Sequence, residues 1–283
     1  MTSLARIRSA LGPPAYERDK VLLYHGDCLK LLPLLPPDSI DLTVTSPPYN
    51  IGKEYESRRE VAEYIDWCAE WIAELYRVAA PTGAFWLNLG YLSLPGRARA
   101  VPIPYLLWDR VPFYLVQEVV WQYGAGVAAR RAYSPRNEKF LWYVRDPASV
   151  YFDLDAVRDP NIKYPNQFKN GKRKVNLAGK NPGDVWSFPK VTSGRNRSSP
   201  ERTPHPAQFP LAVIERIIKG SSPTDAIVLD PFMGSGSTAE AAMKLGRPAL
   251  GFELNPAYIE IAARRLDAVA ADRQDAELQL PLA

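Results

Sequence analysis

The chain has 283 residues, a net charge of +4, 46% hydrophobic residues and 23% charged residues, which is the composition of a globular protein. It has no apolar run of the ~18 residues that span a membrane and no apolar core of a secretory signal, so a cytoplasmic protein is expected. Two cysteines (Cys28, Cys68) and two histidines (His25, His205) are too few for a disulfide framework or a metal cluster, and no metal site is expected.

The first half of the chain predicts alternating strands and helices. Short apolar runs predict strands, and apolar residues repeating about every 3.6 positions predict helices. The expected strands are 21–25, 40–45, 84–89, 115–123 and 139–145. The expected helices are 28–35, 59–80 and 104–109, and residues 124–137 form a basic loop.

Residues 146–204 interrupt this alternation with a sequence rich in Pro, Gly, Asn and Lys. Between Asn161 and Thr203 there are ten Lys or Arg residues and two acids, so this stretch carries +8 and the rest of the chain about −4. Such a distribution favours a surface for a polyanion, although a solvated loop has the same composition. Four aromatic residues between the charges favour the binding surface: Tyr164, Phe168, Trp186 and Phe188. The candidate polyanion-contacting residues are Arg130, Arg131, Arg136, Lys172, Arg173, Lys174, Arg195 and Arg197.

Regular alternation resumes near residue 210. The expected elements are helices at 210–219, 237–245 and 256–271 and strands at 226–229 and 249–253, followed by a frayed tail. Alternating strands and helices predict an α/β fold with a doubly wound, mostly parallel sheet. The carboxyl ends of such strands are where ligands bind.

The strand at 40–45 ends in Ser46-Pro47-Pro48-Tyr49-Asn50. Two prolines make a stiff corner, and a bare Pro-Pro pair would be read as a capped strand end. Here the Ser46 hydroxyl and the Pro47 carbonyl can both accept hydrogen bonds from one amino group of cytosine or adenine. Two such acceptors stabilise the positive charge that develops when the amino nitrogen attacks an electrophile. Tyr49 offers a stacking face to a base that has left the duplex.

The strand at 226–229 leads into Asp230-Pro231-Phe232-Met233-Gly234-Ser235-Gly236-Ser237-Thr238. This glycine turn opens a helix, whose N-terminal N–H groups suit a carboxylate or a pyrophosphate. Glu253 ends the next strand, 17 residues after Gly236, where a carboxylate can bind ribose hydroxyls. The turn fits a nicotinamide cofactor of an oxidoreductase as well as S-adenosylmethionine. The Ser-Pro-Pro-Tyr corner favours the methyl donor, because hydride transfer has no use for it.

Two further residues are candidates for the cofactor site. Asp27 follows the first strand and can accept from the adenine amino group of a cofactor or cap the next helix, and both readings stay open. His205, in the segment His205-Pro206-Ala207-Gln208-Phe209-Pro210, can pack over the methionine end of the donor or be an ordinary loop histidine.

These motifs, in this order, resemble the permuted (beta-class) DNA amino-methyltransferases over residues 21–266. The resemblance implies a circularly permuted, seven-stranded S-adenosylmethionine-dependent methyltransferase sheet with one antiparallel strand and an inserted target-recognition segment. It implies a catalytic motif at Ser46, Pro47, Pro48 and Tyr49. It implies cofactor-binding positions at Asp27, His205, Asp230, Phe232, Gly234, Ser235, Gly236, Thr238 and Glu253. The chain departs from the family at Phe209, where members often carry Lys.

The resemblance also implies a division of the chain. An N-terminal extension (1–20) precedes the catalytic half (21–145), the target-recognition segment (146–204), the cofactor half (205–271) and a C-terminal tail (272–283). Ser-Pro-Pro-Tyr goes more often with cytosine N4 than with adenine N6, and the adenine alternative stays open. Cytosine C5 methylation is not expected without a Pro-Cys pair. The expected partner is double-stranded DNA; the resemblance is compatible with a cognate restriction endonuclease and with a homodimer.

Overall fold

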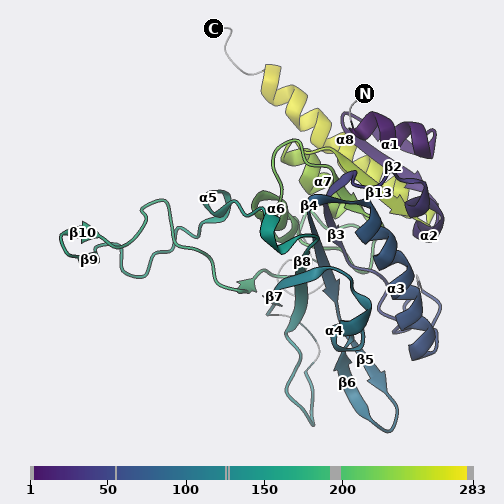
Figure 1. Cartoon of the computed structure of the whole chain (residues 1–283), viewed down its shortest axis with the longest axis horizontal. Coiled ribbons are helices and arrows are strands. Elements are labelled where there is room, and N and C mark those ends of the chain that lie inside the picture. Colours follow the sequence, from purple (N-terminus) through teal and green to yellow (C-terminus); the bar gives the residue numbers. More distant parts are fainter. Residues whose placement is uncertain (1–2, 55, 125, 127, 192–198, 279–283) are drawn as a thin grey trace.

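The computed structural model describes residues 3–54, 56–124, 126, 128–191 and 199–278. Its centre, within this described part, is a nine-stranded sheet in the order β1-β2-β13-β12-β3-β4-β8-β7-β11 (Figure 1). The strands are β1 (Tyr16–Arg18), β2 (Val21–His25), β3 (Ile40–Thr45), β4 (Ala79–Leu89), β7 (Tyr114–Gln122), β8 (Asn137–Val144), β11 (Val185–Ser187), β12 (Val228–Asp230) and β13 (Ala249–Glu253).

Seven of these strands, from β2 to β7 in the sheet order, match the expected methyltransferase sheet. Within them β8 runs antiparallel to both neighbours and every other pair is parallel, as predicted. The outer strands β1 and β11 have three residues each and extend the sheet at its two edges. Runs this short have no detectable periodicity, so the sequence did not predict them.

Helices cover both faces of the sheet, which confirms the doubly wound fold. One core contains residues of α1 (Ser3–Leu11), α2 (Cys28–Leu31) and α3 (Val61–Val78), and the other contains residues of α6 (Leu211–Ser221), α7 (Ser237–Lys244) and α8 (Pro256–Leu278). Along β2 the side chains alternate between the two cores. Leu22 and Tyr24 lie in the core that contains α1, α2 and α3, and Val21 and Leu23 lie in the core that contains α6, α7 and α8. Burial on both faces explains why these strands are apolar throughout.

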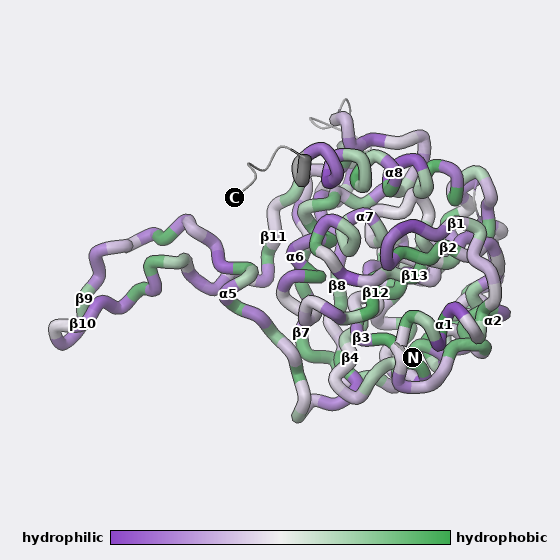
Figure 2. The backbone as a smooth tube through the Cα atoms, turned by 90° about the horizontal axis from the view of Figure 1, so that it is seen from above, coloured by the Kyte–Doolittle hydropathy of each residue, from purple (hydrophilic) through white to green (hydrophobic). Residues whose placement is uncertain are grey.

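Part of the 146–204 segment forms a long arm that projects from the rounded body of the protein (Figures 1 and 2). A bridge between Asp159 and Lys180 closes its base, and the short strands β9 (Phe168–Lys169) and β10 (Lys172–Arg173) pair at its tip. Asn170 and Gly171 make the turn between them with φ angles of 51° and 72°, a conformation that suits these two residue types.

The same segment also contributes to the body, which corrects the reading of all four of its aromatic residues as a binding surface. Tyr164 and Phe168 are exposed on the arm, but Trp186 on β11 is buried and stacks on Trp86. Phe188 packs against the same core. With three residues, β11 is too short to show a periodicity, so the sequence did not mark Trp186 as buried.

Several element boundaries differ from those expected. The helix expected at 28–35 breaks into α2 and the 3-10 helix η1 (Leu32–Leu34), where Pro33 lacks an N–H. The helix expected at 104–109 likewise divides into α4 (Ile103–Leu106) and η2 (Trp108–Arg110). A hairpin of β5 (Tyr91–Leu94) and β6 (Ala98–Pro102) was not expected. The tail that was expected to be frayed after residue 271 is helical as far as Leu278, where α8 ends.

No helix in the described ranges is long and apolar enough to cross a membrane. Among the same residues no group of three or more His, Cys, Asp or Glu side chains is placed to hold a metal ion.

Candidate active site

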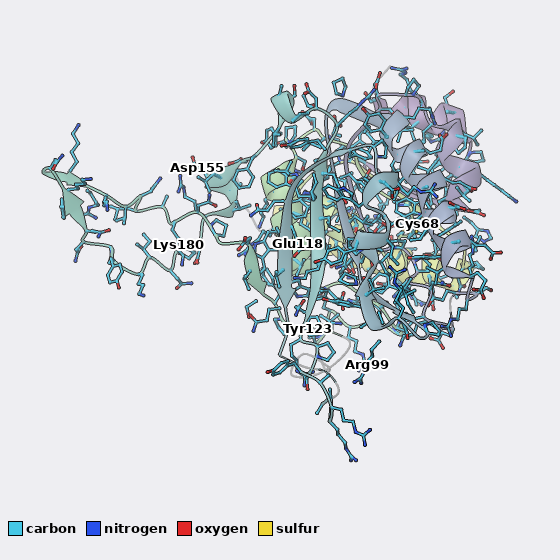
Figure 3. The ribbon with its side chains drawn as sticks, turned by 60° about the horizontal axis from the view of Figure 1, so that its bottom comes forward. Cys68, Arg99, Glu118, Tyr123, Asp155 and Lys180 are labelled. Atoms are coloured by element: carbon cyan, nitrogen blue, oxygen red, sulfur yellow. The ribbon has the colours of Figure 1, made fainter. Side chains whose placement is uncertain are left out.

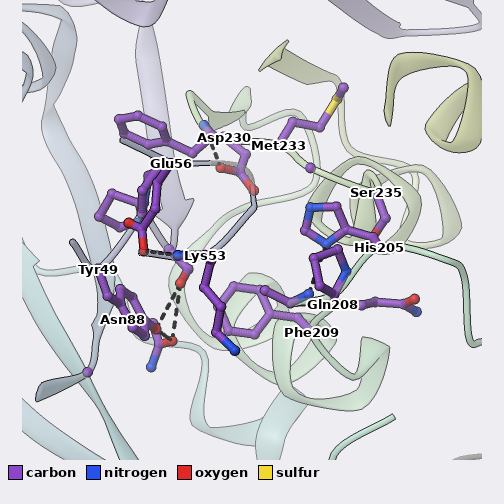
Figure 4. Close-up of a pocket in the computed structure, with 18 of the residues that line it drawn as sticks. Tyr49, Lys53, Glu56, Asn88, His205, Gln208, Phe209, Asp230, Met233 and Ser235 are labelled. Carbon is purple, nitrogen blue, oxygen red and sulfur yellow. Dashed lines mark hydrogen bonds between the residues drawn. The ribbon is translucent and has the colours of Figure 1, made fainter. Parts of the chain in front are cut away.

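A cavity of about 1130 Å³ lies at the carboxyl ends of β2, β3, β4, β12 and β13 (Figure 4). Both predicted motifs line it, together with Asp27, His205 and Glu253. The order of strands explains why the two motifs line one cavity. The strands that precede them, β3 and β12, are adjacent and parallel although they lie far apart in the chain. The chain order reverses between these two strands, which is the position where doubly wound sheets open a crevice.

Asp230 joins the two motifs at the base of the cavity. Its carboxylate accepts hydrogen bonds from the hydroxyls of Thr45, at the end of β3, and Thr238, on α7, each at 2.7 Å, and from the backbone N–H of Phe232 at 3.1 Å. The side chain is fully enclosed, and this burial raises its pKa to about 6 despite the three donors. Asp230 and Thr238 are therefore engaged with each other; direct contact of either with a cofactor stays a prediction.

The Ser-Pro-Pro-Tyr corner presents its acceptors to the cavity. The Tyr64 hydroxyl donates to the Pro48 carbonyl at 2.8 Å, whereas no group in the described residues donates to the Pro47 carbonyl. The Ser46 hydroxyl lies 2.9 Å from the Tyr49 hydroxyl, and the Ser46 residue is half-buried in the cavity wall. The corner thus leaves the Pro47 carbonyl and the Ser46 hydroxyl oxygen able to accept hydrogen bonds from an external amino group.

Gly90, just after β4, supports the Tyr49 ring. A Cβ atom at this position would lie 2.6 Å from Tyr49 Cδ2, closer than any side chain tolerates. The glycine therefore lets the backbone approach the ring and fixes its plane in the cavity wall. No local pattern signals this contact, because Tyr49 and Gly90 follow different strands.

The glycine turn has the backbone that its sequence predicted. Gly234 and Gly236 have φ angles of +53° and +78°, and a Cβ atom at either would lie 2.7 Å from His205 Nε2 or Ala262 Cβ respectively. Glu253 accepts from the backbone N–H of Gly234 and of Asn255, each at 2.8 Å, and burial raises the pKa of its carboxyl. The turn, α7 and Glu253 form one cradle of N–H donors beside a carboxylate.

His205 covers this cradle as a neutral imidazole. Burial, with a contribution from the charge of Arg265, lowers its pKa to about 4. Its Nδ1 accepts from the Ala207 N–H at 3.2 Å, which places the ring proton on Nε2, and the ring packs edge-on against Tyr258. His205 thus lies beside the glycine turn, and its packing over the methionine end of the donor stays a prediction.

Arg265 on α8 binds the glycine turn through hydrogen bonds and was not predicted from the sequence. Its guanidinium pairs with Glu240 at 2.6 Å and donates to the Ser235 carbonyl at 2.8 Å and to the Ser235 and Ser237 hydroxyls at 3.1 Å. The Ser235 side chain is thus bound by Arg265. An arginine in an amphipathic helix carries no local signal of such a role.

Phe232 and Asp27 both line the cavity. Phe232 packs edge-on against Trp67 and Trp71 of α3, with ring centroids 5.6 and 5.2 Å apart. Asp27 caps α2 by accepting from the Leu29 N–H at 3.0 Å, which supports the capping reading, and it also lines the cavity. Trp67 was not among the expected residues.

The candidate DNA-contacting residues fall into two separate groups. Arg130, Arg131 and Arg136 lie on the β7–β8 loop, where Arg136 stands between the cavity-lining residues Pro135 and Asn137 and the other two lie farther along the loop. Lys172, Arg173 and Lys174 are exposed at the tip of the arm, which leaves the body on another side (Figures 1 and 3). Arg195 and Arg197 lie outside the described residues.

The β5–β6 hairpin adds a basic edge that the sequence reading missed. It follows Gly90 directly and carries the exposed Arg97 and Arg99; Figure 3 shows Arg99 on the same side of the molecule as Tyr123, which lines the cavity. The Pro95-Gly96 pair between alternating residues was the available signal, because such a pair marks a turn.

The acceptor corner, the glycine cradle and the sheet order together define an S-adenosylmethionine-dependent amino-methyltransferase. The chain belongs to the DNA methylase family of N6 and N4 type, whose model matches residues 40–264. S-adenosyl-L-methionine is the cofactor of these enzymes. The cradle fits this group, because Ser235, Ser237 and Glu253 line the cavity together and a carboxylate that accepts from two N–H groups has lone pairs left for ribose hydroxyls.

Two relatives and one solved structure illustrate the similarity. The chain is 63% identical over 269 residues to type II methyltransferase M.ScaI of Streptomyces caespitosus, covering 95% of this chain and 88% of the relative. It is 32% identical to DNA adenine methyltransferase YhdJ of Escherichia coli strain K12, covering 92% and 87%. The PvuII DNA methyltransferase (cytosine-N4-specific) has the same fold, with a TM-score of 0.71, 22% identity and coverage of 89% and 88%.

Proposed function

We propose that this DNA amino-methyltransferase transfers a methyl group to the exocyclic N4 of a cytosine that has left the duplex. The observation that carries the proposal is the placement of Ser46 and Pro47 in the same cavity as the glycine cradle. A neutral hydroxyl and a carbonyl are suited to hold the two hydrogens of one amino group.

The choice of cytosine over adenine rests on Ser46. The resemblance associates serine at this position more often with cytosine N4, and the PvuII enzyme of the same fold is named cytosine-N4-specific. YhdJ, which is named an adenine methyltransferase, supports adenine N6 as the second candidate. The chemistry of the corner is the same for both, since both bases offer an amino group.

The residues of the chain hold the reacting group and stabilise its charge. When bound, S-adenosylmethionine supplies an activated methyl group. Ser46 and Pro47 would hold the amino nitrogen toward that methyl group, and after methylation the surplus proton would leave the nitrogen for water. Ser46 and the Pro47 carbonyl stabilise the positive nitrogen before that loss, and Tyr49 stacks on the base.

Double-stranded DNA is the proposed partner, and the basic groups are its proposed contacts. Arg136 lies between two residues that line the cavity, so we assign the loop that carries Arg130, Arg131 and Arg136 to the strand that carries the target base. The arm has six Lys or Arg residues and no acid between residues 160 and 183, which suits contacts with phosphates farther along the duplex.

The division of the chain stays as the sequence predicted it. Residues 21–145 would supply the catalytic half, 146–204 the recognition segment and 205–271 the cofactor half, with 1–20 and 272–283 as flanking segments. The name of the M.ScaI relative favours a cognate restriction endonuclease, and a homodimer is also proposed.

Substitution of the serine tests the function. Ser46→Ala removes one of two acceptors and should lower turnover by roughly 10²-fold, with little change in cofactor affinity. Ser93→Ala, an exposed serine on β5, is the matched control. Mass spectrometry of the methylated DNA should give N4-methylcytosine; N6-methyladenine would overturn the assigned base. Full activity of Ser46→Ala would refute the role of this hydroxyl.

A further inference from the structure

Asn88 is a buried polar residue whose position the proposed chemistry does not yet explain. It lies near the end of β4 with no exposed surface and lines the cavity beside the catalytic corner. Its Nδ2 donates to the Lys139 carbonyl on β8 at 2.9 Å. A carbonyl can only accept, so this bond fixes which end of the amide is nitrogen and turns Oδ1 toward the corner.

The fixed amide sets the direction of the hydrogen bonds in the corner (Figure 4). The Tyr49 hydroxyl donates to Asn88 Oδ1 at 2.5 Å, which commits the phenolic proton. In the 2.9 Å contact between the two hydroxyls, Tyr49 must then accept and Ser46 donate. Asn88 Oδ1 also lies 3.4 Å from Ser46 Oγ, so it offers a second acceptor to the same proton.

We propose that Asn88 is a positioning residue that makes Ser46 an acceptor toward the target base. This inference rests on the proposed function of Ser46. A serine hydroxyl can donate or accept, and a proton turned into the cavity would meet the N–H groups of the target amine. With its proton directed to Tyr49 and Asn88, Ser46 presents only lone pairs to the amino group. A neutral amide cannot take up the proton of the reaction, so Asn88 acts through orientation and not as a general base.

The orientation requirement depends on the proton of Ser46, and this gives a specific test. An aspartate at position 46 would be an acceptor without a proton to orient. Asn88→Ala should therefore lower kcat about tenfold or more in the wild-type background but less than about threefold in the Ser46→Asp background. Cofactor affinity measured by calorimetry should be retained by each variant that is compared, and kcat is measured well below the unfolding temperature of each, because removal of the buried Asn88 amide costs some stability.

If Ser46→Asp proves inactive, a second double-mutant cycle with Ser46→Ala tests the inference. In the Ser46→Ala background there is no hydroxyl to orient, so adding Asn88→Ala should lower kcat by less than about threefold further. Equal losses from Asn88→Ala in the presence and absence of the hydroxyl would overturn the inference and indicate a purely structural residue. A fully active Ser46→Ala would instead refute the proposed role of Ser46 itself, so the two failures are distinguishable.

Discussion

The buried carboxyl of Asp230 predicts a pH dependence of stability that one substitution removes. Burial raises its pKa from 3.8 to about 6, so the folded protein binds this proton more tightly than the unfolded chain does. The contribution of a raised carboxyl is fully present below the unfolded pKa and is lost as the pH rises through the folded value. Two pKa units correspond to about 3 kcal/mol, so the free energy of unfolding should fall by up to that amount between pH 4 and pH 7.

Asp230→Asn should remove this dependence and keep the local contacts. The amide oxygen can still accept from Thr45 and the Phe232 N–H, and the Thr238 hydroxyl can turn to accept from the amide nitrogen. Urea unfolding of wild type and variant from pH 4 to pH 8 gives the difference, which should grow in favour of the variant up to about pH 6 and then stay constant. Asp272→Asn on the exposed surface of α8 controls for the change in net charge. A difference that does not change with pH would refute the reasoning.

Two further predictions concern the cofactor and the DNA. Glu253→Ala should weaken S-adenosylmethionine binding by about 1–3 kcal/mol in calorimetry, because the ribose hydroxyls would lose their carboxylate acceptor; Glu260→Ala on the exposed surface of α8 is the control, and binding of NAD without S-adenosylmethionine would contradict the cofactor assignment. The triple change of Lys172, Arg173 and Lys174 to Ala should reduce the slope of log affinity for duplex DNA against log salt by up to about three, and an unchanged slope would remove the arm tip from the DNA surface.

The sequence by itself determined the parts of this protein that depend on neighbouring residues. Apolar runs identified β2, β3 and β13 within a residue or so of their bounds, because strands buried on both faces are continuously apolar. The glycine turn was predictable because Gly234 and Gly236 require positive φ angles that few other residues adopt. The Ser-Pro-Pro-Tyr corner was predictable because proline restricts its own backbone and that of the preceding residue.

The tertiary structure decided which distant residues complete the site. Asn88, Gly90 and Arg265 reach the motifs from β4, the turn after it and α8, and no local pattern distinguishes them from ordinary strand or helix residues. The same holds for the basic residues: Arg136 lies between two cavity-lining residues, whereas Arg173, of the same charge, lies on β10 of the arm. Charge and chemical type are properties of a residue, whereas the direction of a hydrogen bond or the side of a surface depends on which strands become neighbours in the sheet.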